Sequence, residues 1–171
     1  VDAREEKKFL PGYTVHYSQF PFWIDADKVW NEGITGRGVT VAILDTGVFF
    51  EHPDLIGAIT SSRVFTSETG FFPHDGFGHG TACAGLVASH GIVSWDIGVP
   101  GYRFKVKGVA PSAKILAGKV LDDTGYGFDS WIIQGSEWAV DSKANIISMS
   151  LGGPPTDGTN PLSLAVDAAV D

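Results

Sequence analysis

The feature that constrains the fold most is the run VTVAIL at residues 39–44, which ends on an acid, Asp45, followed by Thr46 and Gly47. Every residue of this run but one is apolar, so a strand built from it has no polar face. Such a run is typical of a parallel strand that is covered on both sides. Functional groups of parallel sheets gather just beyond the carboxyl ends of the strands. We therefore predict a parallel sheet that presents Asp45 at its rim, held by the turn residues that follow.

Further strands and helices alternate along the chain. Strands are predicted at 113–120 and 145–151, and helices at 25–33, 79–89, 128–143 (with Asp129 as its cap) and from Asn160 with Pro161 in the first turn. Residues 91–108 have no clear period and are expected to form a long loop or a hairpin. The alternation predicts an α/β fold, a doubly wound, mostly parallel sheet with helices on both faces. We divide the chain into an N-terminal surface extension, 1–22, and part of one α/β domain, 23–171.

The composition excludes several classes of partner. The formal net charge is −8 and no basic stripe is present, which argues against binding to nucleic acid or to an anionic membrane. No stretch approaches the roughly 18 apolar residues of a membrane span. The single cysteine excludes an internal disulfide. With 43% hydrophobic and 19% charged residues, the chain is expected to be globular.

The ends of the sequence suggest that it belongs to a longer polypeptide. The only methionine is Met149, so Val1 is not expected to be a translation start. The segment that begins at Asn160 opens like a helix but reaches Asp171 without a glycine, a cationic last turn or a polar tail. We expect the sheet of the complete domain to continue beyond this sequence.

Asp45 and His79 are the candidate catalytic pair. His79 lies in the glycine-rich stretch HDGFGHGTACAG, at the expected start of a helix, where the glycines let backbone segments approach each other. An aspartate bonded to the Nδ1–H of a histidine orients the ring and stabilises the imidazolium that forms when Nε2 accepts a proton. The order Asp then His is one of the known orders of such pairs. We predict a carboxylate oxygen ~2.6–3.2 Å from a ring nitrogen.

Several motifs, in order, resemble those of the subtilisin-like serine peptidases, and HGTACAG resembles the proteinase K and kexin branches. The motifs are VAILDTGV with HPDL after it, GHGTACAG, GVAPSAKILAGKVLDDTGYG, SWIIQGSEWAV and IISMSLGG. The resemblance implies that Asp45 and His79 are the catalytic Asp and His of a peptide-hydrolysing serine endopeptidase. Ala82 departs from the histidine that is commonest at this position, a branch variation.

The resemblance places the nucleophile and the oxyanion donor outside this sequence. The nucleophilic serine of the family lies in a G-T-S motif well beyond S-L-G-G, whereas Gly80-Thr81 leads here to Ala82 and Gly158-Thr159 to Asn160. The oxyanion-hole asparagine comes from the strand after the last helix. We therefore expect the C-terminal remainder of the same domain to carry both groups, and residues 1–171 alone to be inactive.

The resemblance also implies how a polypeptide substrate is bound. Two segments, Gly125-Tyr126-Gly127 and Ser150-Leu151-Gly152, are expected to pair with an extended substrate on its two sides. Main-chain pairing of this kind binds peptides largely without reading their side chains, and glycine gives access to the backbone. Leu121 and Leu151 are expected to line an apolar subsite, although both could equally be ordinary core leucines.

Other candidate ligands are weaker. Asp54, in HPDL, matches a position that binds structural Ca²⁺ in the family. The partner region, 89–108, is longer and different here, which argues against an unchanged calcium site. His52, His74 and His79 with Asp75 could suggest zinc, but neither an H-E-x-x-H motif nor a cysteine pair supports it. No cofactor is expected for catalysis. Cys83, four residues after His79, is expected to be a small buried residue.

Two other functions were weighed. An aspartic peptidase would need two D-T-G carboxylates that share a proton, and the chain has one such motif. A non-catalytic subtilase-like module that binds peptides or a propeptide stays open as the alternative. The partners expected from the resemblance are a polypeptide substrate, the C-terminal remainder and an inhibitory propeptide, and the expected location is extracellular.

Overall fold

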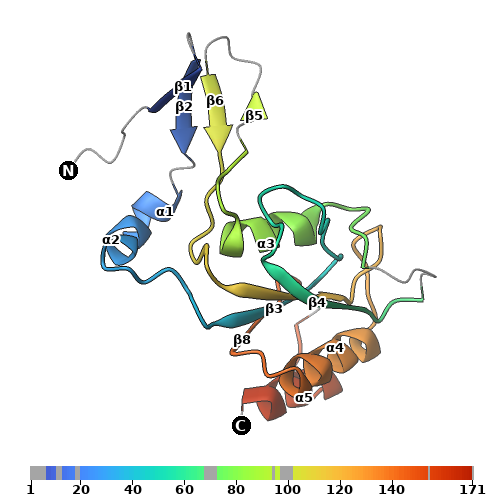
Figure 1. Cartoon of the computed structure of the whole chain (residues 1–171). Coiled ribbons are helices and arrows are strands. Elements are labelled where there is room, and N and C mark those ends of the chain that lie inside the picture. Colours follow the sequence, from blue (N-terminus) through green and yellow to red (C-terminus); the bar gives the residue numbers. More distant parts are fainter. Residues whose placement is uncertain are drawn as a thin grey trace.

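The computed structural model describes residues 7–10, 13–17, 20–67, 73–93, 95–96, 102–153 and 155–170. Its centre is a four-stranded sheet in which all neighbours are parallel, in the order β4-β7-β3-β8 (Figure 1). The strands are β3 (Thr40–Asp45), β4 (Ile59–Val64), β7 (Lys114–Lys119) and β8 (Ile146–Ser148). The prediction of a parallel sheet is confirmed.

Helices cover both faces of this sheet. Helix α3 (His79–Ala88) packs on β3 and β7 from one side. Helix α4 (Asp129–Asp141) packs on the same two strands from the other side, and α5 (Pro161–Val170) packs against α4 (Figure 1). The chain thus has the α/β architecture expected of a subtilisin-like fold, in part.

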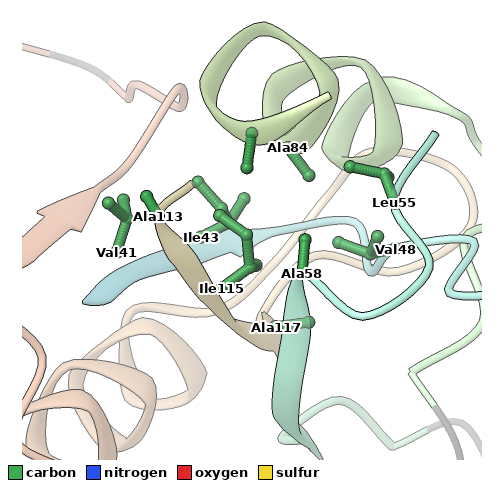
Figure 2. Packing of buried hydrophobic residues seen from close by; sticks show 10 residues of the cluster. Val41, Ile43, Val48, Leu55, Ala58, Ala84, Ala113, Ile115 and Ala117 are labelled. Atoms are coloured by element: carbon green, nitrogen blue, oxygen red, sulfur yellow. The ribbon is translucent and has the colours of Figure 1, made fainter. Parts of the chain in front are cut away.

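Alternate residues of β3 enter two different cores, which explains its lack of a polar face. Val41 and Ile43 pack with Ile115 of β7 against the small residues Ala84 and Ala88 of α3 (Figure 2). The small side chains let this helix lie close to the sheet. On the opposite face, Leu44 packs with Val120, Leu121 and Ile132, and Ala42 packs with Leu116 and Ala139.

One strand was not predicted, and of two predicted helix caps one is wrong and one is confirmed. Strand β4 was not predicted, because four of its six residues are exposed and polar, as at the edge of a sheet. Asp129 does not cap α4, since Phe128 occupies the N-cap position without a side-chain bond. Asn160 does cap α5, where its Oδ1 accepts from the Ser163 N–H at 3.0 Å.

A second sheet joins the N-terminal segment to the middle of the chain. Its strands, β1 (Lys7–Leu10), β2 (Tyr13–Tyr17), β6 (Tyr102–Lys105) and β5 (Trp95–Asp96), follow in the order β1-β2-β6-β5. Strands β5 and β6 are antiparallel, so the hairpin expected within 91–108 is present. Strand β2 pairs with β6, and α1 (Phe20–Trp23) and α2 (Ala26–Asn31) lead from it to β3. No helix in the described parts of the chain has the length and apolar character to cross a bilayer.

Candidate active site

The two side chains predicted to pair do so. Asp45 ends β3 and His79 begins α3, and Nδ1 of His79 lies 2.8 Å from Oδ1 and 3.0 Å from Oδ2 of Asp45. The Asp45 side chain is 1% exposed, whereas the His79 side chain is 44% exposed. A buried carboxylate thus holds the Nδ1 edge of the imidazole, while the side chain as a whole stays partly exposed to solvent and to a reactant.

The backbone around Asp45 fixes its carboxylate. The Thr46 N–H donates to Oδ1 of Asp45 at 2.7 Å, and the Asp45 carbonyl accepts from Val120 and Leu121 at 2.9 and 3.1 Å. Gly80 permits the close approach of α3, since a Cβ there would lie 2.1 Å from the carbonyl oxygen of Gly47. The glycine after His79 is therefore a steric requirement of the pair.

Asp75 organises the start of α3, a role that the sequence did not reveal. Its Oδ1 accepts from the Thr46 hydroxyl and the Gly78 N–H, both at 2.7 Å. Its Oδ2 accepts from the Thr81 N–H at 2.8 Å and the Thr81 hydroxyl at 2.5 Å. Burial raises the pKa of Asp75, but the bonds from Thr81, Gly78 and Thr46 together lower it below its usual value.

Thr46 links Asp75 to the Asp45–His79 pair. Its hydroxyl accepts from the Gly80 N–H at 2.9 Å and donates to Asp75, while its own N–H binds Asp45. The sequence signal for the role of Asp75 is its place, four residues before His79. An acid there can accept from the first amides of a helix, which have no partners within the helix.

Cys83 lies beside the imidazole. Its Sγ is 3.9 Å from Nδ1 and 4.0 Å from Nε2 of His79. Burial is the main cause that raises the pKa of the thiol; a hydrogen bond to Ser150 lowers it, and Asp45 raises it further. The thiol is therefore protonated at neutral pH, which fits a packing role and opposes a nucleophilic one.

The described residues contain one group of three potential metal ligands, Asp45, His79 and Cys83, whose ligand atoms lie within 4.8 Å of one another. His52 and His74 do not join it. Asp75 is occupied by donors from Thr46, Gly78 and Thr81, so the zinc set weighed from the sequence is not assembled.

A defined turn, residues 122–126, includes the first two residues of the Gly125–Gly127 segment. Its ends are joined by the Asp122 N–H bond to the Tyr126 carbonyl at 2.7 Å, and Oδ1 of Asp122 accepts from the Thr124 and Tyr126 N–H groups. Gly125 has φ +83°, and a Cβ on Gly127 would lie 2.4 Å from the Val120 carbonyl oxygen. Tyr126 is 77% exposed.

The second expected segment follows β8. Ser150 and Gly152 are exposed, and the Ser150 side chain lies within hydrogen-bonding reach of the Cys83 thiol. Leu121 and Leu151 pack in one apolar cluster with Leu44 and Ile132. This packing fits the core reading of both leucines, and their role in a subsite stays a prediction.

Asp54 is a buried acid, and only one of its two carboxylate oxygens has hydrogen-bond partners among the described residues. It is 1% exposed, and Oδ1 accepts from the Ile92 and Val93 N–H groups at 2.6 and 2.9 Å. Its Oδ2 is buried without a hydrogen-bond partner among the described residues. The backbone partners, Ile92 and Val93, lie in the region 89–108, and the calcium site stays a prediction.

Known proteins resemble this chain over most of its length. Residues 36–171 match the subtilase family, Peptidase_S8. Subtilisin E of Bacillus subtilis (strain 168) is 44% identical over 147 residues, which cover 86% of this chain and 35% of that protein. Subtilisin of Bacillus pumilus is 44% identical over 86% of this chain and 48% of its own length.

An intracellular serine protease of Paenibacillus polymyxa is 44% identical over 138 residues, which cover 77% of this chain and 38% of that protein. The chain therefore spans less than half the length of these relatives. The detailed resemblance of HGTACAG to particular branches is not tested by these matches.

Proposed function

This chain belongs to the subtilase family, and from that premise we propose that it supplies the Asp and His of an Asp-His-Ser triad in a serine endopeptidase. The observation that carries the proposal is the bond of 2.8 Å between the buried Asp45 carboxylate and Nδ1 of His79. The nucleophilic serine would come from the C-terminal remainder of the same domain.

In the proposed mechanism, the serine hydroxyl attacks the peptide carbonyl while Nε2 of His79 accepts its proton and later returns it to the leaving amine. Asp45 accepts the Nδ1–H bond, which leaves Nε2 free to act as the base. The imidazolium that forms is stabilised by the carboxylate, and the burial of Asp45 strengthens this attraction because water screens it poorly.

The substrate in this proposal is an extended polypeptide between the Gly125–Gly127 and Ser150–Gly152 segments. The exposure of Gly127, Ser150 and Gly152 supports access to these backbones. Leu121 and Leu151 would bound the apolar subsite between them. Binding of this kind relies on main-chain pairing, so a broad range of sequences would be accepted.

The C-terminal remainder is the proposed partner of two surfaces. Strand β8 pairs with β3 and with no other described strand, so one of its edges is available to a further strand. On α5 no residue is fully buried, and Leu164 and Val170 are 57% and 82% exposed. An inhibitory propeptide is a further partner that the family resemblance implies.

We also propose that Asp54 contributes to a structural calcium site. The fit rests on the buried Oδ2 without a described partner, because hard oxygen ligands suit Ca²⁺ and an uncompensated buried carboxylate is costly. EDTA should then lower the melting temperature of the complete protein, and Asp54→Asn should remove this response. An EDTA response that persists in Asp54→Asn would contradict the assignment of this residue.

Export of the complete protein stays a proposal that rests on the resemblance, because the relatives include proteases named as intracellular. Secretion would be tested by detecting the protein in the medium of its own organism.

The test of function uses the complete protein and a fluorogenic peptide. We expect turnover that serine-directed reagents abolish and that pepstatin leaves intact. His79→Ala should lower kcat by up to roughly 10⁶-fold while peptide binding persists. His74→Ala is the matched control, because His74 is an exposed histidine of the loop that precedes α3.

The alternative is the non-catalytic peptide-binding module. It predicts that the wild-type protein binds peptide without hydrolysing it, so His79→Ala would have no turnover to remove. Near-normal turnover of His79→Ala in an active enzyme would refute the catalytic role of this residue.

A further inference from the structure

Lys119 is a buried cation at the carboxyl end of the sheet. It is the last residue of β7 and lies in register with Asp45 of β3, and its side chain is 4% exposed. A buried ammonium is costly unless charged or polar groups compensate it. Beside the strand that ends on Asp45, this ammonium therefore needs hydrogen-bond acceptors that hold it in place.

Its ammonium joins two loops. Nζ of Lys119 donates to the Thr46 carbonyl at 2.7 Å and to Oδ1 of Asp123 at 2.6 Å. The bond from Lys119 is the main cause that lowers the pKa of Asp123, against a smaller opposing effect of burial. Asp123 is thus ionised at neutral pH and accepts a charge-assisted hydrogen bond from the buried lysine.

On one side, the lysine fixes the peptide next to the catalytic carboxylate. The Thr46 carbonyl accepts from Lys119. The Thr46 N–H donates to Oδ1 of Asp45, and its hydroxyl donates to Asp75. The carbonyl belongs to the Thr46–Gly47 peptide and the N–H to the Asp45–Thr46 peptide, so a shift of the carbonyl would act on the donor to Asp45 through the backbone dihedral angles of Thr46.

On the other side, the lysine fixes the turn that leads into the expected substrate segment. Asp123 lies within the turn that Asp122 and Tyr126 close at 2.7 Å. Asp123 also accepts from the Gly76 N–H at 3.1 Å, in the loop before His79. A Cβ on Gly76 would lie 2.4 Å from the Asp123 carboxylate, so glycine is required there for this contact.

From these contacts we propose that Lys119 is a positioning residue, which couples the Asp45–His79 pair to the substrate-binding Gly125–Gly127 segment through Thr46 and Asp123. The inference rests on the proposed function. A displacement of about 1 Å in a catalytic arrangement can lower the rate by roughly 10²-fold, so a rigid link of this kind has a measurable effect.

The experiment compares Lys119→Met, Asp123→Ala and Asp123→Asn in the complete protein. It measures KM, and kcat after titration of the active sites. Lys119→Met should lower kcat by roughly 10- to 100-fold and raise KM, because both loops lose their common donor. Asp123→Ala should mainly raise KM, since the Lys119 bond to Thr46 remains. Asp123→Asn keeps an acceptor oxygen and should recover most of the loss.

Lys114→Met is the matched control. Lys114 begins the same strand and its Nζ also donates to a backbone carbonyl, that of Gly57 at 2.7 Å, but it lies at the opposite end of the sheet from Asp45. It should leave both constants unchanged.

Several outcomes would overturn the inference. Unchanged kcat and KM in Asp123→Ala would overturn it even if Lys119→Met fails to fold. The Asp123 side chain is 49% exposed, so the protein is expected to fold without it. Equal impairment of Asp123→Ala and Asp123→Asn would also do so. A wild-type protein without turnover would instead refute the proposed function, and this inference with it.

Discussion

The replacement of Asp75 by Asn tests whether Asp75 holds the start of the helix that carries His79. Each carboxylate oxygen of Asp75 accepts from one backbone N–H and one hydroxyl: Gly78 and Thr46 at Oδ1, and Thr81 twice at Oδ2. In asparagine one of these oxygens becomes an NH₂ group that faces two donors. The threonine hydroxyl there can rotate and accept, but the backbone N–H cannot.

The magnitude follows from this count. One buried N–H left without an acceptor costs about 1–3 kcal/mol, and the remaining bonds lose their charge-assisted strength, so we expect a total of about 2–4 kcal/mol. For a domain of this size, that corresponds to a fall of roughly 5–15 °C in the melting temperature. Because His79 and Gly80 lie in the first turn of the affected helix, kcat should fall as well.

The pH dependence gives an independent check. The pKa of Asp75 is lowered in the folded protein, so its stabilising contribution is present above the unfolded pKa of about 3.9 and is lost as the pH falls through the folded value. The difference in melting temperature between wild type and Asp75→Asn should therefore be full at pH 7 and shrink below about pH 4.

The assay is thermal unfolding of the complete protein followed by circular dichroism, with peptide hydrolysis measured on the same samples. Asp141→Asn is the control, since Asp141 is an exposed acid at the end of α4 and should change stability by less than about 0.5 kcal/mol. If Asp75→Asn matched this control at pH 7, the proposed role of Asp75 at the start of α3 would be wrong.

Three further outcomes are expected. Gly80→Ala should abolish turnover and lower the melting temperature, because its Cβ would lie 2.1 Å from the Gly47 carbonyl oxygen; an active Gly80→Ala protein would contradict this packing. Cys83→Ala should keep turnover close to wild type, since the thiol is protonated beside His79; a loss as large as that of His79→Ala would place it in the chemistry. Residues 1–171 expressed alone should lack esterase activity and cooperative unfolding, and a monomeric active preparation would refute the need for the remainder.

Local sequence was sufficient for much of the fold and for the pair. The apolar run that ends at Asp45 is a local pattern, and burial of both faces of β3 follows directly from it. The glycines around His79 likewise predicted a close approach, which the steric requirement at Gly80 explains. Strand β4 was missed because a partly exposed edge strand carries no such apolar run.

What the sequence by itself determined, therefore, is which segments are buried strands and which acid and histidine lie at their ends. The tertiary structure alone decided what holds them. In the sequence Asp75 is only a weak candidate zinc ligand and Lys119 is not singled out, yet both bind Thr46, from positions 29 and 73 residues away. Their partners depend on the register of β3 with β7 and on the packing of α3, which are long-range properties that no local pattern encodes.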